Sequence, residues 1–192
     1  MSFAIFIAGP AESRDNSGMP EPNLRVLVSA EQIQQRIEAM GREIDAAYPP
    51  GPIYLIGILK GSWVFLADLA RAIPRHVRVE FLGTSSYGKG KTSSGEVRLT
   101  KDIDALLEGQ HVIIVEDILD TGVTLTFLIG LLDQRRPKSI KVATLLDKPL
   151  RRMRPVRADW IGFEIPDEFV VGYGLDYAED YRNLKDVCVL EA

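Results

Sequence analysis

The sequence has very few of the residues that cross-link a chain or bind transition metals. Its single cysteine, Cys188, excludes a disulfide within the chain and suits a reducing compartment, so we expect a cytoplasmic protein. The two histidines, His76 and His111, stand apart in the sequence and show no recognisable zinc-ligand spacing. Neither a disulfide scaffold nor a zinc protein is expected.

Long apolar runs and an excess of positive charge are also missing. No stretch approaches the ~18 consecutive apolar residues of a membrane span. The N-terminal segment MSFAIFIAGPAESRD has no basic residue before Arg14 and no clear cleavage pattern, so a signal peptide is not expected. The formal net charge of −4 argues against nucleic acid or a membrane surface as a partner.

Length and composition are those of one globular domain. The 192 residues are 46% hydrophobic and 26% charged, which is ordinary for a protein with a single sizeable core. The first part of the chain, residues 1–23, is interrupted by prolines and glycines and is expected to form a loosely ordered arm. Residues 24–192 are expected to form the domain.

Strand-like and helix-like segments alternate along the domain. Ser29 and Gln32 form a capping box ahead of apolar residues at helical spacing, which predicts a helix that ends before Pro49. The alternation predicts an α/β fold, in which a mainly parallel twisted sheet is flanked by helices and the ligand site lies at the carboxyl ends of the strands. Expected strands are 53–59, 77–83, 97–100, 111–117, 140–147, 159–165 and 187–190, and further expected helices are 63–73, 102–109 and 121–136.

The segment VIIVEDILDTGVT (112–124) carries acids where an apolar strand turns into a helix. The first N–H groups of a helix welcome an anion, and Gly122 with the hydroxyls of Thr121 and Thr124 can help to hold a phosphate monoester. Because the chain has no GxxxxGK[ST] motif, this is not a nucleoside-triphosphate P-loop. Glu116 and Asp117 would repel a phosphate, so they suit the cis-diol of a ribose.

Other interpretations of this segment are weaker. Asp and Thr are common helix N-caps, and D-T-G-x-T alone would favour a capped helix. The buried acids four residues earlier favour a ligand site instead, because uncompensated acids on a buried strand are costly. The D-T-G of aspartic proteases occurs in all-β folds, and the D-x-D of aspartyl-phosphate phosphatases is absent, since two residues separate Asp117 from Asp120.

These residues resemble the phosphoribosyl-pyrophosphate signature of the type I phosphoribosyltransferases. From about Leu24 to Leu190 the chain is similar to the hypoxanthine-guanine branch of that family. The resemblance implies the fold of the family, with a small purine-binding hood built from the terminal segments, mostly from residues 148–192. It implies that Glu116 and Asp117 hold the ribose hydroxyls, and that Asp120 exchanges a proton with purine N7. The implied 5′-phosphate loop consists of Asp120, Thr121, Gly122, Val123 and Thr124.

Two further motifs fit the same family. ILKGSW (58–63) is similar to its pyrophosphate loop, which implies a cis peptide before Lys60 and pyrophosphate contacts from Lys60, Gly61 and Ser62. SSYG (85–88) is similar to the pair that closes over the reacting sugar, here Ser86 and Tyr87, and closure would exclude water. Taken alone, the first motif would be a strand-end turn and the second a surface loop.

The purine half of the resemblance lies in LLDKP (145–149) and GFEIPDEFVVGYGLDYAEDYRNL (162–184). Lys148 is implied as the donor to purine O6, a choice that would reject adenine. Phe169 is implied to stack on the base, and Val170 to meet its edge through the backbone. Asp176, with Glu116 and Asp117, is implied as a ligand of Mg²⁺, and Arg182 as a contact of pyrophosphate. Without the family, Phe169 and Val170 would be taken for core residues.

The resemblance implies a magnesium-dependent purine-salvage transferase. It would convert hypoxanthine or guanine plus phosphoribosyl pyrophosphate to IMP or GMP plus pyrophosphate, and would act as a homodimer or homotetramer. The alternative is a regulator that senses the sugar pyrophosphate and binds RNA or DNA. The arginine-rich segment PLRRMRPVR (149–157) shows no interleaved aromatics, so we interpret it as a solvated loop.

Overall fold

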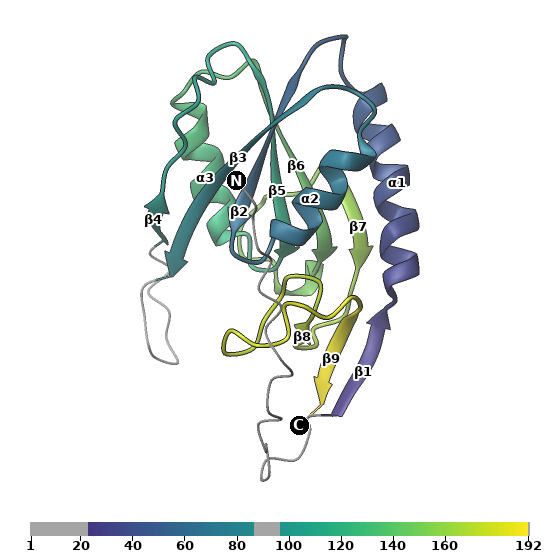
Figure 1. Cartoon of the computed structure of the whole chain (residues 1–192). Coiled ribbons are helices and arrows are strands. Elements are labelled where there is room, and N and C mark those ends of the chain that lie inside the picture. The colour runs from purple at the N-terminus through teal and green to yellow at the C-terminus, as the bar shows by residue number, and fades with distance from the viewer. Residues whose placement is uncertain (1–22, 87–96, 192) are drawn as a thin grey trace, which may run out of the picture.

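The computed structural model describes residues 23–86 and 97–191, and in them a central sheet lies between helical layers (Figure 1). Six strands follow the order β4-β3-β2-β5-β6-β7, and every neighbouring pair is parallel except β3 and β4. A second sheet has the order β1-β9-β8. The strands are β1 (Asn23–Val28), β2 (Ile53–Leu59), β3 (Val77–Ser86), β4 (Val97–Lys101), β5 (His111–Leu119), β6 (Ser139–Asp147), β7 (Trp160–Glu164), β8 (Val170–Val171) and β9 (Val187–Glu191).

Within the part of the chain that the structure describes, three α-helices connect the strands: α1 (Ala30–Ala46), α2 (Trp63–Ala72) and α3 (Val123–Asp133). A short 3₁₀ turn, η1 (Pro149–Arg151), follows β6. In the described ranges, no helix is both long enough and apolar enough to cross a membrane.

The first helix forms as its sequence predicts. The side chain of Ser29 accepts a hydrogen bond from the N–H of Gln32, and the Gln32 side chain accepts one from the N–H of Ser29, so the capping box is complete. Its apolar residues at helical spacing are buried, and they are Ile33, Ile37, Met40 and Ile44.

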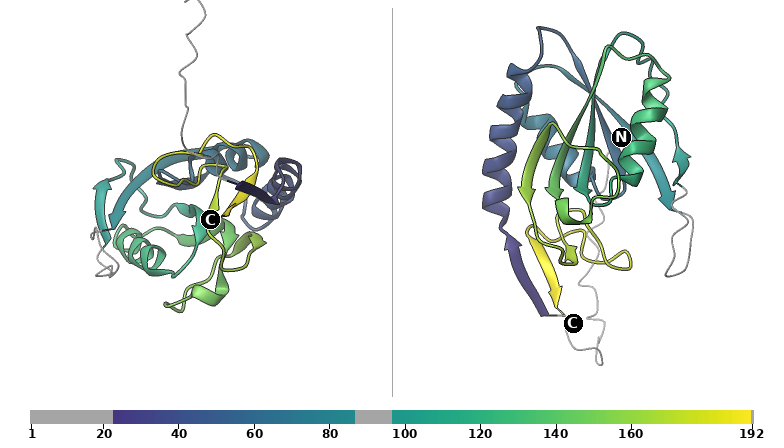
Figure 2. Two further views of the ribbon diagram at one scale, coloured as in Figure 1. Left: turned by 90° about the horizontal axis from the view of Figure 1, so that it is seen from below. Right: turned by 180° about the vertical axis from the view of Figure 1, so that it is seen from behind.

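Each face of the large sheet has its own apolar core. Because successive side chains of a strand point to opposite faces, Leu55 packs with α1 and α2 whereas Ile56 packs with α3. Figure 2 shows α1 and α3 on opposite sides of the sheet. The parallel strands are therefore covered on both faces, and their polar ends are the place left for a ligand.

The small sheet forms a hood beyond the carboxyl ends of the parallel strands (Figure 1). We call β1, β8, β9 and the segment 165–186 the hood. β1 pairs antiparallel with β9, which brings the start of the described chain beside its end. The N–H of Ala30, at the start of α1, donates to Asp186 of the hood at 2.7 Å.

The expected α/β class, with its mainly parallel sheet and a hood from the terminal segments, is confirmed. The short helix expected over 102–109 is wrong, because this segment is irregular and buries Ile103 and Leu107 without helical turns. The helix expected over 121–136 is shorter, and its buried residues are Leu125, Leu128 and Leu132. The expected arm falls, apart from Asn23, outside the described residues.

Candidate functional site

A cavity of about 430 Å³ lies between the carboxyl ends of the central strands and the hood. Its walls come from segments far apart in the sequence: the ends of β2, β5 and β6, the turn after β6, and the hood. The lining residues are Lys60, Gly61, Asp117, Ile118, Asp120, Lys148, Arg151, Phe169, Val170, Leu175, Asp176 and Arg182.

The loop after β2 forms one wall. A cis peptide bond joins Leu59 to Lys60, as the resemblance implies. Gly61 lies directly against the carboxylate of Asp117, and the backbone of Gly174 in the hood lies directly against the Gly61 carbonyl. A side chain at either glycine would collide with these groups, so the close approach of the three segments depends on glycine.

Ser62 has a different place in this loop. It is fully buried, and its hydroxyl donates to the carbonyl of Ile58 at 2.8 Å. The Ser62 N–H points to the same carbonyl at 3.4 Å. In this conformation Ser62 anchors the loop, and its expected contact with pyrophosphate stays a prediction.

Glu116 and Asp117 lie on opposite faces of β5, because neighbouring residues of a strand alternate. Asp117 lines the cavity, whereas Glu116 does not and is only 7% exposed. Burial raises the pKa of Asp117 to about 6, against the opposing effect of nearby backbone N–H groups and Arg182. Burial, and then the charge of Asp117, raises the pKa of Glu116 well above its ordinary value. These acids need a partner that offsets their charge.

Asp120 follows β5 and faces the cavity beside the start of α3. Arg151 Nε lies 2.9 Å from Asp120 Oδ1 in an ion pair, and the same arginine lies 3.3 Å from Asp167. Gly122 caps α3 in a left-handed conformation with φ of 80°, a conformation that suits glycine. Residues 121–124, the expected phosphate loop, adjoin this cavity through Asp120 but are not among its lining residues.

Another part of the cavity wall is formed by Lys148, Phe169 and Val170. Lys148 is 8% exposed, and its ammonium donates to the carbonyl of Glu168 at 2.6 Å. An ammonium has three N–H donors, so two remain for other acceptors. Phe169 is 55% exposed and packs edge-on against Tyr177, which leaves ring area for a flat ligand.

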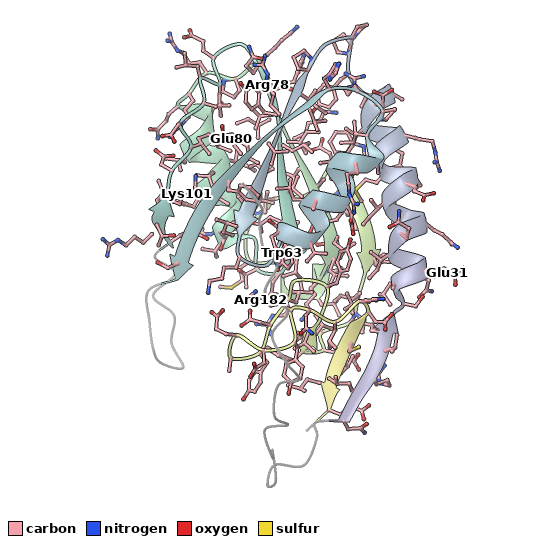
Figure 3. All side chains as sticks on the ribbon, in the orientation of Figure 1. Glu31, Trp63, Arg78, Glu80, Lys101 and Arg182 are labelled. Atoms are coloured by element: carbon pink, nitrogen blue, oxygen red, sulfur yellow. The ribbon has the colours of Figure 1, made fainter. Side chains whose placement is uncertain are left out.

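Arg182 and Lys60 bring positive charge to the cavity. Arg182 Nη2 lies 2.7 Å from Asp176 Oδ1, and Arg182 Nη1 donates to the Gly174 carbonyl at 2.8 Å. Lys60 forms an ion pair with Glu179 at 2.8 Å. Figure 3 places Arg182 below Trp63, and both residues line a second cavity of about 410 Å³. Lys60 and Arg182 thus both form ion pairs with acids in this part of the cavity.

The structure gathers nine of the expected site residues around one cavity. They are Lys60, Gly61, Asp117, Asp120, Lys148, Phe169, Val170, Asp176 and Arg182. Ser62, Glu116 and residues 121–124 are placed beside it but not on its wall. Of the expected closing pair, Tyr87 lies outside the described residues, and Ser86 is described only in its backbone, which pairs with Val97.

Sequence reasoning missed three residues of the wall: Ile118, Arg151 and Leu175. Ile118 lies between Asp117 and Asp120 in the signature, and this position between two expected site residues could have indicated it.

The interpretation of 149–157 as a solvated loop is wrong for Arg152, whose side chain is only 16% exposed and contacts the segment around Asp120. Arg151 is exposed, as expected of a solvated loop, and still pairs with Asp120. The partners of both arginines in that segment, Leu119 and Asp120, are more than 30 positions away in the chain, so no local pattern indicates these contacts.

Comparison with known proteins identifies the class. The family model described as the phosphoribosyl transferase domain matches residues 27–178, and the chain belongs to this family. A hypoxanthine-guanine phosphoribosyltransferase of Bacillus subtilis (strain 168) is 48% identical over 167 residues, which cover 87% of this chain and 93% of that protein. A protein of the same name from Mycobacterium avium is 47% identical over 197 residues, with 100% and 95% covered.

A solved structure agrees with both relatives. The crystal structure of a hypoxanthine-guanine phosphoribosyltransferase from Bacillus anthracis matches with a TM-score of 0.84 and 44% identity, and the match covers 89% of this chain and all of that one. Within the family, the chain therefore groups with the hypoxanthine-guanine phosphoribosyltransferases.

Proposed function

We propose that this chain transfers the phosphoribosyl group of phosphoribosyl pyrophosphate to N9 of a 6-oxopurine, in purine salvage. Hypoxanthine and guanine would give IMP and GMP, with pyrophosphate as the second product. The observation that carries the proposal is the single cavity on which acids, cations and an exposed aromatic ring converge from five separate segments. The names of the relatives support the same activity.

The two ends of the cavity suit the two substrates. Lys148 would donate to purine O6, Phe169 would stack on the ring, and the backbone of Val170 would meet its edge. At the other end, Lys60, Gly61 and Arg182 would bind pyrophosphate, and Ser62 would support their loop. The ribose would lie between them, with its hydroxyls at Asp117 and Glu116 and its 5′-phosphate at the N-terminus of α3. Residues 121–124 would supply the donors there.

Asp120 would handle the proton of purine N7 as N9 attacks C1′ and pyrophosphate leaves. A positioned base of this kind contributes roughly 10²–10⁴-fold to the rate. Its carboxylate already faces the cavity and has Arg151 as its partner, so an entering base would take the place of that arginine. Ser86 and Tyr87 would close over the site and exclude water from a sugar with oxocarbenium character.

The acids of the site fit Mg²⁺. The expected ligands Glu116, Asp117 and Asp176 are hard oxygen donors, and Asp176 is near enough to Asp117 to affect its pKa. Among the described residues no three acid, histidine or cysteine side chains form a preformed metal cluster. Mg²⁺ is commonly held by one or two carboxylates together with substrate phosphates, and this donor set suits that mode. Bound there, the ion would neutralise charge on the leaving pyrophosphate.

Turnover of hypoxanthine, guanine, xanthine and adenine with phosphoribosyl pyrophosphate and Mg²⁺, followed by ultraviolet absorbance, tests the proposal. Turnover of 6-oxopurines without turnover of adenine is the expected result. Saturable binding of phosphoribosyl pyrophosphate with no turnover of any base would instead support the regulator. The purine end of the cavity favours the enzyme, because a sensor of the sugar pyrophosphate has no need of Lys148 and Phe169.

The remaining expectations are part of the same proposal. We expect a cytoplasmic enzyme, which suits the free, buried Cys188, and an assembly of two or four copies. Residues 24–192 would act as one domain, with the purine-binding part mostly from 148–192. Size-exclusion chromatography coupled to light scattering would give the number of copies.

A further inference from the structure

The chain that follows β6 lies along the turn between β5 and α3. It makes three backbone hydrogen bonds, one to the last residue of β5 and two to that turn, and side chains of the same segment pack on Gly122. We call residues 148–156 the clamp segment. Its donors are Lys148 N to Leu119 O (3.0 Å), Met153 N to Thr121 O (2.9 Å) and Arg154 N to Thr121 O (3.2 Å).

Arg152 adds the side-chain contacts of the clamp segment. Its Nη1 donates to the carbonyl of Leu119 at 3.1 Å and to the carbonyl of Asp120, and its Nη2 donates to Oδ1 of Asp147. The side chains of Arg152 and Asp147 are only 16% and 11% exposed. A buried arginine without a counterion is costly, so Asp147 is what keeps the guanidinium in place.

The two carbonyls held by Arg152 determine the direction of two amides. In a trans peptide the C=O and the next N–H point in opposite directions. With the Leu119 and Asp120 carbonyls turned toward Arg152, the N–H groups of Asp120 and Thr121 are turned away from it. A cation on the carbonyl side also polarises these peptide units, which strengthens their N–H groups as donors.

We propose that Arg152, held by Asp147, is a positioning residue for phosphoribosyl transfer. It fixes the peptide units on both sides of Asp120, so that their N–H groups are available to the 5′-phosphate and the Asp120 carboxylate is held at the cavity. Arg152 lines a separate cavity of about 860 Å³ and is not on the wall of the catalytic one, so it acts through the loop. This inference rests on the proposed function.

Chemical rescue tests the inference. In the full chain, Arg152→Ala should raise both KM and the dissociation constant for phosphoribosyl pyrophosphate by about 10–100-fold, the loss that corresponds to charge-assisted hydrogen bonds. Millimolar guanidinium chloride should restore part of that affinity, because the cavity beside Arg152 gives the ion access. Arg157→Ala is the matched control, since Arg157 is an exposed arginine that follows the clamp segment and lines the same cavity.

Two conservative variants separate positioning from folding. Asp147→Asn keeps an acceptor without the charge, and Arg152→Lys keeps the charge without the fork of donors. Both should raise KM for phosphoribosyl pyrophosphate more than KM for hypoxanthine, whose contacts come from Lys148 and Phe169. They remain informative if Arg152→Ala does not fold.

The outcomes are distinct. Unchanged affinity for phosphoribosyl pyrophosphate in Arg152→Ala, or in both conservative variants, would overturn the positioning role. Lower thermal stability with unchanged affinity would overturn it as well. Absence of turnover in the wild-type chain with every base would overturn the proposed function alone, because the binding measurement still tests Arg152.

Discussion

Lys148 is the residue on which we expect base selection to depend. The Glu168 carbonyl holds the Lys148 ammonium at the cavity. Movement of the ammonium away from an incoming base would break this hydrogen bond and cost free energy. Lys148→Met removes the donor to O6, and kcat/KM for hypoxanthine should fall by about 10²-fold or more. Steady-state rates with hypoxanthine and adenine measure this, and Lys138→Met, at an exposed lysine before β6, is the control. An unchanged ratio of the two rates would contradict the assignment.

Asp117 is expected to lower the stability of the ligand-free protein. Its pKa is raised to about 6, so the unfolded chain releases this proton at lower pH than the folded one. The free energy of unfolding should therefore fall as pH rises from about 4 to 6, and the loss persists above that range. With Mg²⁺ removed, Asp117→Asn should raise the free energy of unfolding by roughly 2–3 kcal/mol at pH 7.5.

At pH 4, where Asp117 is protonated in the folded protein, the same variant should raise the free energy of unfolding only a little. Urea unfolding at both pH values measures the difference, and Asp104→Asn, at an exposed acid outside the site, is the control. An equal gain at pH 4 and pH 7.5 would show that the charge of Asp117 is not the cause. Such a loss of folding stability is common where a buried charged group binds a ligand and does not stabilise the fold.

At the scale of elements, the loop after β2 and the hood meet through two glycines. Gly174 has φ of 102°, and a side chain on it would meet the backbone of Gly61. Gly174→Ala should therefore push the two segments apart, raise KM for phosphoribosyl pyrophosphate, and lower the free energy of unfolding by about 1–3 kcal/mol. Steady-state kinetics and urea unfolding check both effects.

Gly109→Ala separates the two causes. Gly109 also has positive φ, 70°, but nothing lies within 4 Å of the added side chain. It should carry the backbone cost of about 1 kcal/mol and leave KM unchanged. If both variants gave the same KM, the contact between Gly174 and Gly61 would have no part in substrate binding.

Element patterns predicted most of the fold, and the exceptions have physical reasons. Ile103 and Leu107 have helical spacing, yet Arg135 holds Asp102 at 2.6 Å and the Ile103 carbonyl at 3.1 Å, which buries both apolar residues without a helix. β8 has only two residues, too few for a periodic signal. Local patterns predict strands and helices well, but they do not predict which distant segment forms hydrogen bonds with a given side chain.

The site shows the same division. The place of Asp117 on the cavity wall could be predicted from the end of an apolar strand, because buried acids there need a ligand, whereas Glu116 does not line the cavity. The contact of Arg152 with the carbonyls of Leu119 and Asp120 could not be predicted, since it exists only once β5 and β6 are paired in the sheet. Most residues that line the cavity lie in recognisable motifs, whereas the contacts of Arg152 that hold the loop depend on tertiary packing.

For the whole molecule, the site lies between two parts, the large sheet and the hood. The base would touch the hood at Phe169, and the phosphate would touch the large sheet at the start of α3. A nucleotide that spans both should stabilise the folded chain, and IMP at 100 times its dissociation constant should add about 2.7 kcal/mol. For a chain of this size, that corresponds to a rise in Tm of about 5–11 °C.

Ribose 5-phosphate and AMP are the matched ligands for this measurement by differential scanning calorimetry. At the same concentration both should give a smaller rise than IMP, because the first has no base for the hood and the second offers Lys148 no acceptor at position 6. Phe169→Ala should reduce the rise produced by IMP and leave that produced by ribose 5-phosphate unchanged. If ribose 5-phosphate raised Tm as much as IMP, the hood would not take part in nucleotide binding, and the assignment of the purine to that end of the cavity would be wrong.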